Sequence, residues 1–540
     1  MANSTRGRPY GSVGRRRSAV PARAPLPTTQ DRAAWLLRVN RLYGREPRWA
    51  KGDSFARSFH GGSWPAQVSV SSISRWETGV TRVGHSAVRR YEQLLGLPPG
   101  QLTATIDILH RYAAPSAGAV PLLARAPGDL GAAERRVDTL LDRALDDAPV
   151  TGADWDELTV LLVLHPQLRL RSRDWTALAE RLLTESLVSD GLAWQQRHEA
   201  LNRVLGHPSG QVAAVSACIA WAADAHNQVF LEPVCLLDSS AHPDAASGVL
   251  AQLARPTNDS AFLGALLACV RKVRLQHFDR PQSAVLARLV KQVAYDADGR
   301  QAEERALAAV VSRMLDGAPP SLPARTRTGA GERYGSDIAA RVTASALSAV
   351  SREIPRFTDP LLPLLIREML LHPVFDMRLY AAMMVAATPY RAPVAAAMSY
   401  ELSRLAVARD VTLAGRLLEA LRIVGGTAER PLVQRLALAP TLPEAVVRAA
   451  TSALAHMGGV SPRSFWENAL ALAPAAGGAS RPAGGRAASA AVYGLGISGE
   501  TDLLRRVSGD LRIPSKTRAA ASWWLRLPSR VRAGGAAKRA

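Results

Sequence analysis

The protein has 540 residues, a formal net charge of +21, 47% hydrophobic residues and 21% charged residues. Its length exceeds the roughly 250–300 residues at which single cores stop growing, so we expect several structural units, and its apolar content excludes a disordered chain. Three cysteines without a CxxC spacing exclude a disulfide framework and give no indication of structural zinc. There is no apolar run of about 18 residues and no apolar core of a secretory signal. We therefore expect a cytoplasmic protein without membrane contact.

The positive charge is concentrated at the two ends of the chain. Residues 1–30 hold six arginines and no acidic residue, and residues 526–540 hold five basic residues and no acidic one. We interpret the first segment as a disordered basic arm and the second as a basic tail. Basic ends on a nearly neutral body favour contact with a polyanion. Arginine is also frequent in the rest of the chain. A GC-rich coding sequence would produce the same bias without contact with a polyanion, and this alternative stays open.

Residues 31–113 predict a compact helical unit. A first helix is expected within 31–44, where apolar residues recur at helical spacing. A short second helix follows within 53–62 and ends at a Gly-Gly pair. The third helix lies within 68–79, with Ser69 as its N-cap. A further helical stretch, beginning near HSAVRRYEQLLGL, closes the unit.

The third helix has a polar face that is typical of DNA recognition. Ile73 and Trp76 are three residues apart and face inward, which leaves serine and arginine side chains outside. An apolar back and a short polar front are what a helix needs to dock in the major groove, where hydroxyls and arginine contact bases or phosphates. Two further residues precede the next helix, whose N–H groups can bind phosphate. The candidate DNA-binding residues are Ser69, Ser71, Ser72, Arg75, Arg82 and His85.

The stretch ISRWETG, followed by HSAVRRYEQLLGLPPGQL, resembles the lambda-repressor-like helix-turn-helix of the XRE family of regulators. The resemblance implies a DNA-binding domain that usually acts as a dimer on a two-fold site, with DNA contacts from the serines and Arg75 of the third helix. It also implies a polar contact within the domain for Glu77 and a helix end at Gly79. The chain departs from the family pattern at Asp53 and Ser54, which replace a Thr-Gln pair, and in HGGSWPAQV, which lengthens the next turn.

The rest of the chain predicts a helical body. Residues 114–131 are rich in Pro, Gly and Ala, so we interpret them as a linker. Residues 132–320 predict a helical domain of irregular repeats, 321–336 a loop, and 337–525 more regular helical repeats.

Five arginines in the second half recur at intervals of 38, 32, 38 and 32 residues. They are Arg378, Arg416, Arg448, Arg486 and Arg518. Each opens a segment with small or apolar residues at fixed offsets, and a period of about 30–40 residues built of paired helices is typical of an α-solenoid. DMRLYAA, PEAVVRAATSAL and PSKTRAAASWWL resemble HEAT repeats. The predicted fold is therefore all-α, with an N-terminal helix-turn-helix domain followed by an α-solenoid of HEAT-like repeats.

The motifs of common enzyme classes are absent, including the P-loop, the dinucleotide-binding GxGxxG and the GxSxG nucleophile elbow. His198 and His207 lack the HExxH spacing, and Cys218 is flanked by apolar residues, so we interpret these residues as structural. We therefore expect no catalytic residue, no metal site, no cofactor and no enzyme activity.

These patterns predict a transcriptional regulator that reads a promoter site in double-stranded DNA and is therefore nucleoid-associated within the cytoplasm. Its helical repeats would serve assembly, or partner or effector binding, and both a homodimer and a protein partner on the solenoid fit this interpretation. Two alternatives stay open. One is a HEAT-repeat DNA-processing enzyme such as a glycosylase, which a basic concave groove with an acidic residue would favour. The other is a non-catalytic protein-interaction scaffold.

Overall fold

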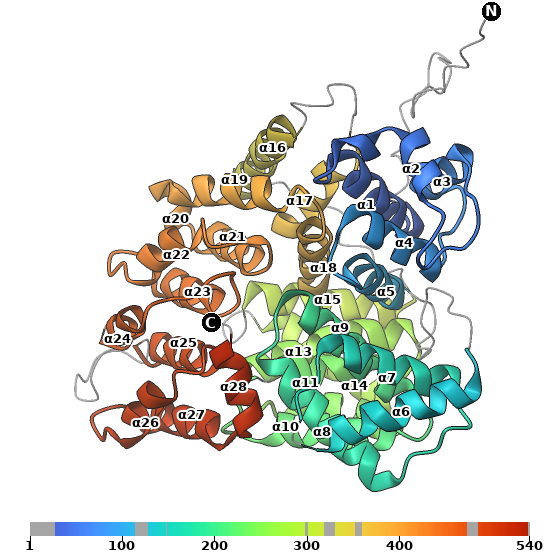
Figure 1. The fold of residues 1–540 in the computed structure, drawn as a ribbon. Helices are drawn as coiled ribbons and strands as arrows, with labels where there is room; N and C mark the ends of the chain where they lie inside the picture. Colours follow the sequence, from blue (N-terminus) through green and yellow to red (C-terminus); the bar gives the residue numbers. More distant parts are fainter. Residues whose placement is uncertain are drawn as a thin grey trace, which may run out of the picture.

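The computed structural model describes residues 27–113, 128–146, 148–229, 231–296, 301–317, 330–350, 359–471 and 484–537. Over these ranges the chain forms 28 α-helices, two short 3-10 helices and no β-strand, so the all-α prediction is confirmed. The helices form an N-terminal unit and two arrays of stacked helices (Figure 1). Each helix in the described ranges is too short or too polar to cross a bilayer.

The N-terminal unit is built around buried aromatic rings. Its elements are α1 (Thr29–Tyr43), η1 (Pro47–Ala50), α2 (Gly52–Ser58), α3 (Val70–Glu77), α4 (His85–Leu95) and α5 (Gln101–Ala113). Phe55, Phe59 and Tyr91 are fully buried, and their ring centroids lie 4.9 to 5.7 Å apart. These rings join α2 to α4 and fix the positions of the helices around them.

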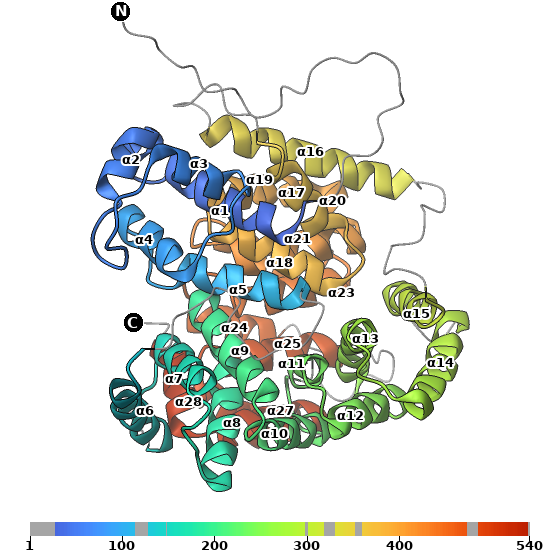
Figure 2. The same ribbon diagram turned by 90° about the vertical axis from the view of Figure 1, so that its right-hand side faces the viewer.

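The first array contains ten α-helices in two rows (Figure 2). They are α6 (Leu130–Leu145), α7 (Gly152–Leu164), α8 (Ser172–Leu187), α9 (Gly191–Gly206), α10 (Gln211–Ala223), α11 (Leu231–Leu236), α12 (Pro243–Ala254), α13 (Asp259–Arg274), α14 (Arg280–Tyr295) and α15 (Ala302–Leu315), with the 3-10 helix η2 (Leu237–Ser239) after α11. Even-numbered helices contact one another in succession, and odd-numbered helices form the second row, in which η2 links α9 to α11. Each helix therefore buries its apolar face against its neighbours.

The second array follows the same plan. It contains α16 (Ala330–Val350), α17 (Leu362–Leu371), α18 (Phe375–Ala386), α19 (Arg391–Ser403), α20 (Leu405–Arg409), α21 (Val411–Val424), α22 (Arg430–Ala437), α23 (Glu444–Leu454), α24 (Arg463–Ala471), α25 (Gly484–Ile497), α26 (Thr501–Gly509), α27 (Ser515–Arg526) and α28 (Ser529–Ala537). Helices α18, α21, α23, α25 and α27 form one row in which each helix contacts the next.

The repeat period of the sequence corresponds to this row, because each of its five helices carries one of the regularly spaced arginines. Arg378 on α18 reaches the next helix of the row, where its Nε donates to Glu419 at 2.8 Å. Small residues allow close stacking: Gly494 and Gly496 on α25 lie directly against the buried rings of Trp466 and Trp524, where a Cβ atom would clash. A helical array is thus present where the repeats were predicted.

The N-terminal unit packs against both arrays. The Arg32 guanidinium of α1 pairs with Glu368 of α17 at 2.6 Å. The Trp35 indole N–H donates to Asp359 at 2.9 Å. On the other side, α5 contacts both α9 and α18 (Figure 2). The unit is therefore part of one continuous structure.

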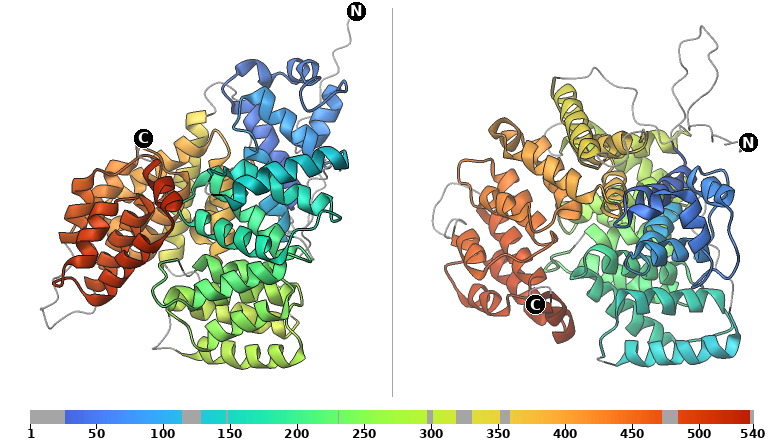
Figure 3. Two further views of the ribbon diagram at one scale, coloured as in Figure 1. Left: turned by 60° about the horizontal axis from the view of Figure 1, so that its bottom comes forward. Right: turned by 45° about the horizontal axis from the view of Figure 1, so that its top comes forward.

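The two arrays also meet at their far ends, where the C-terminal helices return to the first array (Figure 3). The Trp523 indole N–H donates to Asp224 at 3.1 Å, and its ring packs edge-on against Trp221 at a centroid distance of 5.7 Å. Helix α28 contacts α8. The Trp523 side chain, which is buried, thus serves packing between the arrays.

Parts of four expected segments lie outside the described residues. These are residues 1–26 of the basic arm, 114–127 of the linker, 321–329 of the loop and 538–540 of the basic tail. The described parts of these segments are largely helical. A capping box between Thr28 and Asp31 starts α1 inside the expected arm, and α28 lies inside the expected tail. Helix α16 begins at Ala330, inside the expected loop, because Tyr334 packs against the core and continues the apolar face of the helix.

Candidate functional site

Helix α3 is docked on the N-terminal unit by its inner face. Ile73 is 1% exposed, and α3 contacts α1 and α2. The helix starts where expected, because the Ser69 hydroxyl accepts a hydrogen bond from the Ser72 backbone N–H at 3.1 Å. It ends as expected too, since Gly79 has a φ of +71°, in the left-handed region that favours glycine.

A buried polar group holds the C-terminal end of α3. The Arg41 Nε atom donates to one Glu77 oxygen and an Arg41 terminal nitrogen donates to the other, both at 2.6 Å. The Tyr91 hydroxyl donates to Glu77 at 3.0 Å. Burial lowers the pKa of Arg41, but the Glu77 carboxylate outweighs burial and the net shift is upward. The polar contact expected for Glu77 within this unit is confirmed.

The longer turn before α3 is fixed by aromatic rings. Trp64 packs against Phe59 at 5.8 Å and against Trp76 at 5.5 Å, measured between ring centroids. The preceding helix, α2, ends at Ser58, four residues earlier than predicted. It ends there because the Arg90 guanidinium donates hydrogen bonds to the backbone carbonyl groups of residues 58–60. These contacts set the position of α3 relative to α2.

The outer face of α3 combines predicted and unpredicted residues. Ser71 and Arg75 are exposed, as predicted, and α3 lies at the edge of the molecule, away from the second array (Figure 1). Ser72 is half-buried, and its hydroxyl lies 2.9 Å from that of Ser69. Sequence reasoning missed Val70 and Ser74, which are exposed on the same face. Val70 and Ser74 are four residues apart, as are Ser71 and Arg75, so helical spacing could have identified them as a second exposed row beside the first.

The other two candidates lie in the segment that leads into α4. Arg82 is exposed, and His85 is half-buried at the first position of α4. Arg82 also lies near His110 of α5: burial and the Arg82 charge together lower the pKa of His110 to about 4. The structure therefore places Arg82 beside α5, whereas Ser71 and Arg75 lie on α3.

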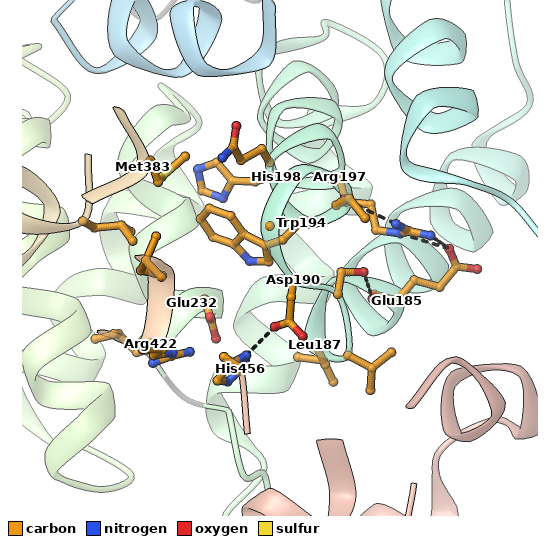
Figure 4. Close-up of a pocket in the computed structure, with 18 of the residues that line it drawn as sticks. Glu185, Leu187, Asp190, Trp194, Arg197, His198, Glu232, Met383, Arg422 and His456 are labelled. Atoms are coloured by element: carbon orange, nitrogen blue, oxygen red, sulfur yellow. Dashed lines mark hydrogen bonds and ion pairs between the residues drawn. The ribbon is translucent and has the colours of Figure 1, made fainter. Parts of the chain in front are cut away.

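A second candidate site is a cavity of about 1140 Å³ between the two arrays. Its walls include residues of α8, α9, α11 and α13 from the first array and of α17, α18, α19, α21 and α28 from the second. The Trp194 and His198 rings project into it side by side from α9, with Met383 of α18 facing them (Figure 4). In the chain, the wall residues of the first array end at Arg271 and those of the second begin at Met369.

Ring stacking and polar contacts organise the cavity wall. The Trp194 and His198 rings are stacked, with centroids 4.7 Å apart, and burial lowers the pKa of His198 to about 4. His198 is therefore uncharged at neutral pH. His456 bridges two elements, because its Nδ1 atom lies 2.6 Å from Asp190 and its Nε2 atom 2.8 Å from the Tyr493 hydroxyl. The sequence interpretation of His198 as structural missed its place in the cavity wall.

The cavity wall also touches the N-terminal unit. Arg271 of α13 donates to the Arg111 carbonyl of α5 at 2.8 Å. Tyr380 of α18 packs against Tyr112 of α5 at a centroid distance of 4.6 Å. The residues that enclose the cavity thus contact the last helix of the unit that carries α3.

Within the described part of the chain, no group of three or more His, Cys, Asp or Glu residues has the arrangement of a metal site. The three cysteines are free thiols. Comparison of the chain with known protein families, with curated proteins and with solved structures finds no match.

Proposed function

We propose that the protein is a transcriptional regulator that inserts α3 into the major groove of double-stranded DNA. The observation that carries this proposal is the outer face of α3, where Ser71, Ser74 and Arg75 are exposed above a firmly docked inner face. Hydroxyl and guanidinium groups are the groups that read base edges and phosphates. Helices α3 and α4 also lie in the stretch whose sequence resembles the lambda-repressor-like, XRE-type helix-turn-helix.

The two arrays form the body of the proposed regulator. Their stacked helix pairs and the arginine-bearing row support HEAT-like repeats, which would provide assembly or a surface for a partner or effector. A single recognition helix covers few base pairs, so we propose that the protein binds a two-fold site as a homodimer. Selection of binding sites from random DNA by the full chain tests the proposal. A recovered consensus sequence supports it, whereas base-excision products would favour a DNA-processing enzyme, and no DNA recovery would favour a protein scaffold.

Replacing Arg75 by alanine should weaken binding to the selected site by about 5- to 150-fold, because a bidentate arginine–guanine contact contributes about 1–3 kcal/mol. The loss should be confined to one base position, where the variant accepts other bases. Mobility shifts on the selected site and on single-base changes measure this. Arg505, an exposed arginine of α26, provides the control Arg505→Ala, which should bind as the wild type does. Equal binding of Arg75→Ala and wild type to every sequence would contradict the assignment.

Removing residues 1–26 should weaken binding to all DNA sequences by a similar factor. Six arginines lie in this segment without any acidic residue, so it should bind phosphates rather than bases. The deletion stops before Thr28 in order to keep the cap of α1. The slope of log affinity against log salt should become shallower by about 0.9 for each phosphate that the shortened protein no longer neutralises. An unchanged slope would show that the segment does not bind DNA.

A further inference from the structure

The cavity between the arrays is large enough for a drug-sized molecule, because ligand pockets typically measure about 300–1000 Å³. Its volume is about 1140 Å³, and apolar side chains such as Leu187, Met383 and Ile423 form part of the wall. A water-filled cavity of this size leaves apolar surface in contact with water, which a ligand with a hydrophobic ring would remove.

Most arginines in the cavity wall already form ion pairs or hydrogen bonds with other residues of the protein. Arg181 and Arg197 both contact Glu185, at 2.8 and 3.4 Å. Arg378 contacts Glu419 at 2.8 Å, and Arg391 donates to the carbonyl groups at the end of α21. At these four arginines, an anionic ligand would have to displace contacts within one array or the other.

Two carboxylates in the wall lack such partners. Among the described residues, neither Glu232 nor Asp376 forms an ion pair within 4 Å or accepts a hydrogen bond from a basic side chain. Burial raises the pKa of both groups, that of Asp376 to about 7, and the nearby Asp238 carboxylate adds to the effect on Asp376. Arg422 near Glu232, and Arg271 and Arg378 near Asp376, act in the opposite direction but do not cancel it. A bound cation would supply the counter-charge that these carboxylates lack.

A flat, uncharged surface lies in the same cavity. The stacked rings of Trp194 and His198 project inward from α9, and Glu232 of α11 lies near Arg422 of α21 (Figure 4). An indole face attracts both flat rings and cations, and the attraction increases when the cation is removed from water. The ring surface and the unpaired carboxylates therefore both favour a flat, positively charged molecule.

We propose that this cavity binds a planar organic cation, with its ring on Trp194 and its charge facing Glu232 and Asp376. The ligand's role as an effector rests on the proposed function, through the contacts of Arg271 and Tyr380 with α5. Binding itself does not depend on DNA.

Calorimetric titration of the full chain, without DNA, tests the inference with three molecules of nearly the same shape. At pH 7.5, 9-aminoacridine is a cation, acridine is uncharged and acridine-9-carboxylate is an anion. We expect one site for 9-aminoacridine, with affinity at least tenfold higher than for acridine, and no binding of the carboxylate. Tighter binding of the uncharged or anionic molecule would overturn the proposal.

Four variants separate the ring contact from the charge contact. Glu232→Gln and Asp376→Asn should each weaken 9-aminoacridine about tenfold and leave acridine unchanged, whereas Trp194→Leu should weaken both molecules. Asp502→Asn, on an exposed helix of the second array, should change neither. Circular dichroism and thermal unfolding establish whether each variant is folded. If Asp376→Asn does not fold, the Glu232→Gln variant alone decides the test of the charge contact. Unchanged 9-aminoacridine affinity in the folded charge variants would overturn the proposal, while a failure of DNA binding alone would not affect it.

Discussion

Replacing Glu199 by alanine should lower the free energy of unfolding by about 3–5 kcal/mol, the range measured when one partner of a buried ion pair is removed. The side chains of Glu199 and Arg111 are 1% and 7% exposed, and the Arg111 Nε atom donates to Glu199 at 2.9 Å. Without the carboxylate, the guanidinium loses this buried counter-charge at the junction of α5 and α9. Chemical denaturation of the full chain, followed by circular dichroism, measures the effect.

An exposed ion pair of the same array provides the control. Glu157 and Arg136 lie 2.8 Å apart, but their side chains are 44% and 42% exposed. Solvent screens this pair, so Glu157→Ala should cost about 0–1 kcal/mol. Equal losses in the Glu157 and Glu199 variants would show that burial of the pair does not determine its contribution.

The contribution of Glu199 should also depend on pH. Burial raises the pKa of Glu199, but the charge and hydrogen bond of Arg111, with smaller contributions from Arg203 and His198, together outweigh burial, so the folded pKa lies below the usual value. The stabilisation is therefore complete above the unfolded pKa of about 4.3 and is lost as the pH falls through the folded pKa. The stability difference between wild type and Glu199→Ala should be constant from about pH 6 to 8 and should decrease in acid below about pH 4.

The repeat arrangement could be predicted from sequence because it is local. Arg378, Arg416 and Arg448 recur at the interval that brings each new helix back to the same row. Small residues at fixed offsets, with Gly494 against Trp466 as an example, show which face packs. Such signals lie within one helix pair and need no knowledge of distant contacts.

The closure of the arrays could not be predicted in this way. The contacts of Trp35 with Asp359 and of Trp523 with Asp224 join residues about 300 positions apart. Nothing in the local pattern around Trp35 distinguishes a ring that packs inside its own unit from one that also contacts a distant loop. The interpretation of residues 114–131 as a linker would allow the helical body from Ala132 onward to fold on its own, and this stays a prediction. The buried Arg111–Glu199 pair now leads us to expect that a fragment beginning at Ala132 would be destabilised.

The same distinction applies to the two candidate sites. The inner and outer faces of α3 follow from helical spacing, so the exposure of Ser71 and Arg75 was predictable from eight consecutive residues. The cavity depends on helices from both arrays. Glu232 and Asp376 are ordinary acidic residues in the sequence, and only the fold brings them into one cavity without paired arginines.

Replacing Glu77 by leucine should also cost about 3–5 kcal/mol, because Arg41, with a side chain 9% exposed, loses its buried counter-charge. The Tyr91 hydroxyl loses its acceptor at the same time. Glu77 is the last residue of α3, so its loss frees the end of the helix that we propose enters the groove. On that proposal, the variant should bind all DNA sequences more weakly, in contrast to the single-position effect of Arg75→Ala. Denaturation and mobility shifts on two unrelated sequences measure the two effects.

A triple variant, Arg41→Met, Glu77→Leu and Tyr91→Phe, decides whether the loss is electrostatic. Apolar side chains of similar volume can replace a buried polar group at little cost when no member is left unpaired. The triple variant should therefore recover more than half of the stability lost in Glu77→Leu. Recovery is incomplete because Arg41 also donates to the carbonyl groups of Trp49 and Ala50 at 2.8 and 2.9 Å. If the triple variant is no more stable than Glu77→Leu, the Glu77 side chain stabilises α3 by packing, and its charge serves another purpose.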